Sequence, residues 1–186
     1  MVDRAGNELS VERVDNVSIV LLKVTRTAID SAREKLQLAM PLEVEGSDPR
    51  SLWLGPDRWL LVSDSTSPDT IITSCTRALA GILHNAVDYS AALAAFRLTG
   101  PEARQLLATG TGIDLRSGKF PVDSCCRTRL AQIAAVIVAE APETYNVYVD
   151  RSYETYLADW LAESASIYFS YRADPETTVD YRSFDG

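Results

Sequence analysis

The segment SLWLGPDRWLLVS, residues 51–63, carries the strongest folding signal in this chain. Two apolar runs, residues 51–54 and 58–63, flank the tripeptide Gly55-Pro56-Asp57. Proline presets its own φ for a turn, and aspartate hydrogen-bonds to the neighbouring backbone. Two apolar runs separated by three such residues predict a β-hairpin.

Strands and helices continue on both sides of this hairpin. Residues 16–25 alternate in the manner of a strand, and Thr27 begins a helix that we expect to end at Pro41. After the hairpin, Ser67-Pro68 begins a second helix, because proline is tolerated at the first helical position. Gly81 is expected to stop this helix.

The second half of the chain has a similar layout. We expect strands at 86–89 and 93–99, then a helix from Gly100-Pro101 to Gly110. Residues 127–139 form a long strand or a bent pair, 144–149 a further strand, and Ser152 caps a last helix.

The recurrence of this layout predicts an α+β fold in which one strand and helix unit is used twice. We place the halves at about residues 14–81 and 86–163, within a single domain of residues 1–167. The halves share a layout without sequence identity. The tail, residues 168–186, has no apolar period and is expected to be extended or disordered.

Composition narrows the possible partners. The chain has 186 residues, 46% of them apolar, which is enough for a substantial core. Its 18 Lys and Arg against 26 Asp and Glu give a net charge of −8, and the sequence contains no basic cluster, which argues against nucleic acid. The polar N-terminus and the lack of an apolar run near 20 residues predict a cytoplasmic protein that binds no membrane.

No pattern of catalytic, cofactor-binding or metal-binding residues emerges. The single histidine, His84, excludes sites that need two imidazoles, and no GxSxG nucleophile motif is present. The adjacent Cys125 and Cys126 are either a reactive thiol pair or small semi-buried residues at the start of a strand. We predict no metal site, because neighbouring strand residues face opposite ways.

Four other side chains have both a structural and a functional interpretation. Trp53 and Trp59 flank the hairpin turn, where tryptophan either covers a core or anchors an interface. Arg127 and Arg129 are two residues apart on an expected strand and therefore share a face. They either bind an anion or an acidic partner, or form a solvated face with local ion pairs.

The segment LGPDRWLLV at 54–62 and several later segments carry a resemblance to a known family. The first of them is similar to the LGPDxWLL stretch of the gamma subunit of heterotetrameric sarcosine oxidase. The further matching segments, in the same order along the chain, are VDYS at 87–90, FRLTGPEAR at 96–104, CRTRLAQ at 126–132 and YVDRSY at 148–153. The resemblance extends over about residues 50–162.

The resemblance implies a fold like the tetrahydrofolate-binding domain of glycine-cleavage aminomethyltransferases. It also implies an accessory subunit of a cytoplasmic flavoenzyme that demethylates sarcosine to glycine, forming hydrogen peroxide and 5,10-methylenetetrahydrofolate. FAD, FMN, NAD and tetrahydrofolate would lie on the alpha, beta and delta partner subunits. Trp53, Trp59, Arg127 and Arg129 would then be candidate subunit contacts, and an exposed apolar or aromatic patch is expected.

Two alternatives remain open. The chain could be a folate-binding protein of the aminomethyltransferase type, although its segment from Arg151 to Tyr156 lacks the glycine of that family's motif. It could also serve a related complex that oxidises another N-methyl amino acid.

Overall fold

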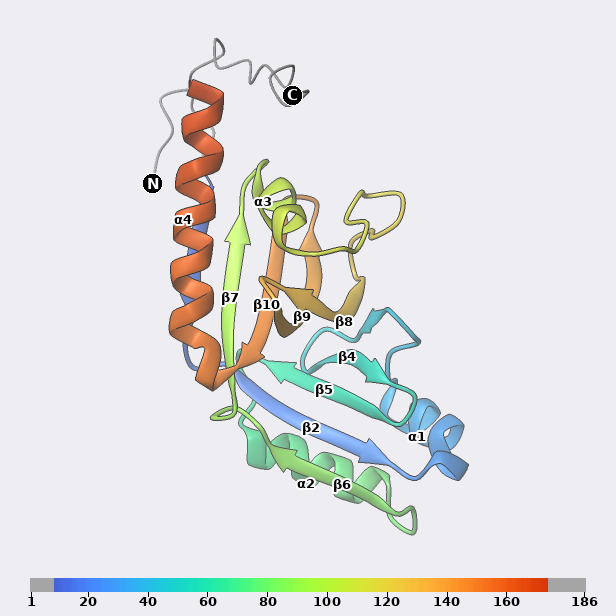
Figure 1. The fold of residues 1–186 in the computed structure, drawn as a ribbon. Coiled ribbons are helices and arrows are strands. Elements are labelled where there is room, and N and C mark those ends of the chain that lie inside the picture. The colour runs from blue at the N-terminus through green and yellow to red at the C-terminus, as the bar shows by residue number, and fades with distance from the viewer. Residues whose placement is uncertain (1–8, 174–186) are drawn as a thin grey trace, which may run out of the picture.

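The computed structural model describes residues 9–173, which form two five-stranded sheets packed face to face (Figure 1). The strands of one sheet cross those of the other steeply, and helices lie against the outer face of each sheet (Figure 1). Within residues 9–173, no helix combines the length and apolar character needed to cross a lipid bilayer.

The first sheet has the order β3-β4-β5-β2-β6. Its strands are β2 (Ser18–Val24), β3 (Val44–Glu45), β4 (Arg50–Gly55), β5 (Arg58–Ser63) and β6 (His84–Asp88). The short 3-10 helix η1 (Arg26–Ala28) leads into α1 (Ile29–Leu36), and α2 (Pro68–Ala78) connects β5 to β6. Both α-helices pack on the outer face of this sheet.

The second sheet has the order β1-β7-β10-β9-β8. Its strands are β1 (Ser10–Val14), β7 (Leu93–Thr99), β8 (Cys125–Leu130), β9 (Ile133–Ala141) and β10 (Thr144–Asp150). Its outer face is covered by α3 (Ala103–Gly110) and by α4 (Glu154–Ala173), which follows the 3-10 helix η2 (Arg151–Tyr153).

The two sheets confirm the expected duplication. Reading the second sheet from β8 gives β8-β9-β10-β7-β1, which matches β3-β4-β5-β2-β6 position by position. The edge strands differ from the expected halves. The strand expected at 86–89 in the second half is β6, His84–Asp88, and it pairs with β2, whereas β1 fills the corresponding edge of the second sheet by pairing with β7. Periodicity identifies a strand but not its partner, so the sequence did not reveal this exchange.

The elements around the first hairpin are close to expectation. β4 and β5 pair as predicted, with Trp53 opposite Trp59 and an irregularity at the turn. Ser67 caps α2 by accepting a hydrogen bond from the Thr70 amide at 3.3 Å. The expected end of the first helix at Pro41 is wrong, because Gln37 adopts φ 51° and ends α1 four residues earlier.

In the second half, residues 127–139 are a bent pair rather than one strand. Ala131 and Gln132 both have positive φ, and this turn separates β8 from β9. The expected cap at Ser152 is wrong: the Asp150 carboxylate accepts from the Ser152 amide at 2.9 Å. Helix α4 continues to Ala173, so residues 168–173 of the expected tail are helical, and residues 174–186 lie outside the described residues.

Buried side chains form three layers that give the fold its order of helix, sheet, sheet, helix. One layer lies between the first sheet and α1 and α2, and a second between the second sheet and α3 and α4. The third joins the two sheets and includes Leu60, Val136 and Tyr148. Each sheet is therefore buried on both faces along its centre, and polar side chains concentrate where the sheets diverge.

Candidate functional site

A cleft of about 240 Å³ opens at one end of the contact between the two sheets. Four of the five segments that carry the family resemblance contribute to its lining. These lining residues include Leu54, Arg58, Tyr89, Arg127, Tyr148 and Asp150. The segments are far apart in the chain, so their convergence is a property of the tertiary structure. We treat this cleft as the candidate functional site.

Arg127 and Arg129 lie on β8, the edge strand of the second sheet, and share its inner face with Cys125. Both arginines are exposed, and Arg127 lines the cleft directly. Neither forms an ion pair with any residue of the described part of the chain. Their guanidinium groups are therefore available to an external anion.

The two tryptophans are placed differently from the arginines. Trp59 is only 1% exposed, packs under α1 and α2, and donates from Nε1 to the Ala39 carbonyl at 3.0 Å. Its side chain is a core element of this chain, which contradicts the expectation that it contacts another subunit. Trp53 is partly buried and packs against both the inter-sheet layer and the layer under α1 and α2.

The opposite end of the inter-sheet contact is polar and internally paired. There Arg50 from β4 forms ion pairs with Glu140 and with Asp123, the latter at 2.8 Å. Asn146 donates to Glu140 at 3.0 Å and accepts from Arg97 at 3.1 Å. This chain of contacts connects the two sheets beside a cavity of about 190 Å³. Because its charges offset one another, we interpret it as a structural clamp.

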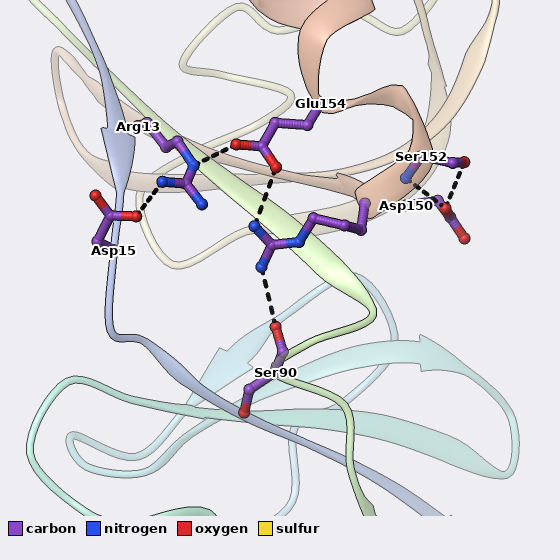
Figure 2. Close-up of polar contacts among 7 residues, drawn as sticks. Arg13, Asp15, Ser90, Asp150, Ser152 and Glu154 are labelled. Atoms are coloured by element: carbon purple, nitrogen blue, oxygen red, sulfur yellow. Dashed lines mark hydrogen bonds and ion pairs between the residues drawn. The ribbon is translucent and has the colours of Figure 1, made fainter.

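A third polar cluster fixes the exchanged strand β1 against the start of α4 (Figure 2). Arg13 forms ion pairs with Asp15 and with Glu154. Arg151 pairs with the same Glu154 at 3.0 Å and donates to the Ser90 carbonyl at 3.3 Å. The Glu154 carboxylate thus pairs with two arginines and joins β1 to the start of α4. Sequence reasoning missed this cluster because its members come from three separate segments.

An apolar hollow of about 430 Å³ lies between the loops that precede β3 and β8. Leu42, Ile113 and Phe120 line it, and Leu42 is 55% exposed. The neighbouring Val122 is also exposed. The hollow fits the expected apolar patch.

The three cysteine thiols are buried and protonated at neutral pH, and the histidine lies beside a backbone carbonyl. Burial raises the pKa of the Cys75 thiol to about 11, that of Cys125 to about 12 and that of Cys126 to about 11. Cys125 faces the inter-sheet layer and Cys126 the layer under α3 and α4. His84 Nδ1 lies 2.8 Å from the Ile82 carbonyl. No three metal-ligating side chains come together within residues 9–173.

The raised thiol pKa values predict that the folded chain becomes less stable at alkaline pH. The folded thiols stay protonated up to pH about 11, whereas in the unfolded chain they ionise near pH 9.0. Their contribution to stability is therefore intact below pH 9 and is lost as the pH rises through about 11 to 12. Urea unfolding midpoints should fall over this range, and fall less steeply in a Cys125→Ala variant. An equal fall in both proteins would contradict the assignment.

The chain matches the family described as sarcosine oxidase, gamma subunit family, over residues 24–167. The sarcosine oxidase subunit gamma of Corynebacterium sp. (strain U-96) is 26% identical over 115 residues, 62% of this chain and 55% of that protein. That of Arthrobacter sp is 26% identical over 119 residues, 64% of this chain and 58% of that protein. The matched region thus spans little more than half the length of these relatives.

Two solved structures show the same fold. A chain of the heterotetrameric sarcosine oxidase from Corynebacterium sp. U-96 superposes with a TM-score of 0.77 at 22% identity, covering 87% of this chain and 85% of that one. Aminomethyltransferase T of the glycine cleavage system from Bartonella henselae gives 0.62 at 12% identity, covering 84% of this chain and 46% of that one. The expected α+β, aminomethyltransferase-like fold is confirmed.

Proposed function

The chain belongs to the sarcosine oxidase gamma subunit family, and from this we propose that it is an accessory, structural subunit of a multi-subunit sarcosine oxidase. The complex would oxidatively demethylate sarcosine to glycine and form hydrogen peroxide and 5,10-methylenetetrahydrofolate. The observation that carries the proposal is the family match over residues 24–167. The protonated, buried thiols and the ion-paired carboxylates described above support a non-catalytic role.

The partners in this proposal are alpha, beta and delta subunits, which would hold FAD, FMN, NAD and tetrahydrofolate. The chain's own contribution is a rigid pair of clamped sheets with surfaces left open for contact. Arg127, which lines the cleft, Arg129 on the same strand face and the partly buried Trp53 are the proposed contact residues, and the apolar hollow at Leu42 is a second candidate surface. Location in the cytoplasm is part of the same proposal.

The alternative of a folate-binding protein rests on fold likeness alone. In this chain the middle of the inter-sheet contact is filled by Leu60, Val136 and Tyr148. The two open ends have volumes of about 190 and 240 Å³, below the range usual for sites that enclose a drug-sized ligand. These dimensions favour protein contact over cofactor binding.

The test is a pull-down of the tagged full chain from its native cells at low ionic strength. The eluate is examined for flavin absorbance, for the masses of co-eluting chains and for turnover of sarcosine against other N-methyl amino acids. We expect a yellow complex with larger subunits that prefers sarcosine. A colourless chain eluting alone would overturn the subunit role, and a yellow complex that prefers another amine would overturn only the substrate.

A further inference from the structure

The cleft is bordered by cations from both sheets. Arg58 on β5 and Arg127 on β8 line it from opposite sides. Lys23 lies across from Arg58 in the β2–β5 pair, and Arg129 lies two residues beyond Arg127 on the same face of β8. All four cations therefore project from the facing sides of the two sheets, where the sheets diverge. We call these four residues the basic rim.

The nearby anions do not neutralise the basic rim. Asp57 accepts from Arg58 at 3.3 Å and lies 3.8 Å from Arg26. Asp150 also lines the cleft, but its Oδ1 accepts from the Ser152 amide and hydroxyl. Near the four cations of the basic rim there are thus two carboxylates, those of Asp57 and Asp150. This local excess of positive charge occurs in a chain whose net charge is −8.

The floor of the cleft is apolar and continues onto an exposed edge. Leu21, Leu54 and Leu93 line the cleft. Val87 on β6 lies opposite Leu21 in the β2–β6 pair and is 42% exposed. The surface therefore joins an apolar strip to a basic border, a combination that favours a protein segment over a simple inorganic anion.

We propose that the basic rim and its apolar floor bind an extended acidic segment of a partner subunit. The cleft volume of about 240 Å³ accommodates one or two side chains rather than a folded domain. An apolar side chain of the segment fills the cleft while its carboxylates pair with Arg127 and Arg129. This inference rests on the proposed function, since the partner is another subunit of the complex. The overall negative charge disfavours a nucleic acid at this surface.

The test uses the full complex and a zero-length carbodiimide cross-linker, which joins an amine to a carboxylate that it contacts. Lys23 should form cross-links to an aspartate or glutamate of a partner subunit, identified by mass spectrometry. The double variant Arg127→Glu, Arg129→Glu should bind its partners at least tenfold more weakly and lose this cross-link. Wild-type binding should also weaken more steeply with added salt than binding of the variant.

A matched control separates this surface from overall charge. The double variant Lys35→Glu, Arg77→Glu makes the same charge change at exposed positions on α1 and α2. It should assemble like the wild type, and both double variants should keep the wild-type unfolding midpoint. Normal assembly of the β8 variant, or Lys23 cross-links only to a second copy of this chain, would overturn the inference. A wild-type chain that enters no complex would instead overturn the proposed function.

Discussion

Replacing Trp59 with alanine should destabilise the folded chain by about 3–5 kcal/mol, the usual cost of removing a fully buried tryptophan. Its indole is 1% exposed and packs with Leu22, Leu61 and Leu79 under α1 and α2. Removal leaves a cavity in that layer and an unpaired carbonyl at Ala39. Urea unfolding of the full chain, followed by circular dichroism, measures the loss.

A Trp59→Phe variant is the control for packing. It keeps an aromatic ring in the layer and removes the hydrogen bond to Ala39, so its cost should be well below that of alanine. An unchanged unfolding free energy of Trp59→Ala together with weaker subunit assembly would contradict the core role and favour an interface role for Trp59.

Replacing Gly110 with alanine should cost about 1–3 kcal/mol through overpacking. A Cβ at this position would lie 2.5 Å from Trp160 Cη2 and 3.0 Å from Leu130 Cδ1. Gly110 is the last residue of α3, and its carbonyl accepts from the Ala131 amide at 3.0 Å in the β8–β9 turn. The glycine therefore allows α4, α3 and this turn to meet, and thermal unfolding of the variant measures the cost.

Gly112→Ala is the matched control, because a Cβ there has no neighbour within 4 Å. Its unfolding free energy should stay within about 0.5 kcal/mol of the wild type. Trp160→Leu combined with Gly110→Ala should recover part of the loss, which gives a favourable coupling energy in a double-mutant cycle. Purely additive effects of the two substitutions would contradict the steric explanation.

Local signals in the sequence located most of the elements. The turn residues Gly55-Pro56-Asp57 identified the β4–β5 hairpin, and Ser67-Pro68 identified the start of α2. These features were predictable because turn and cap chemistry act within a few residues. Errors occurred where a residue took an uncommon backbone conformation, as when Gln37 ended α1 with a positive φ.

The candidate site was predictable only in part. The sequence placed Arg127 and Arg129 on one strand face, and the structure puts them on the inner face of β8. The sequence did not indicate that Arg58 would lie across the cleft from Arg127, which is 69 positions later in the chain. No local sequence pattern encodes a contact between two sheets. The sequence also left Trp59 open between core and interface, which only its burial decided.

The sequence by itself determined the duplicated α+β layout and the family to which its ordered segments belong, because apolar periodicity and turn residues are local properties. The tertiary structure decided which strands share a sheet, as shown by the exchange of β1 and β6. It also gathered four cations into one rim on an acidic chain. Strand pairing and sheet packing depend on long-range burial and on edge positions, and the order of residues along the chain does not express these relations.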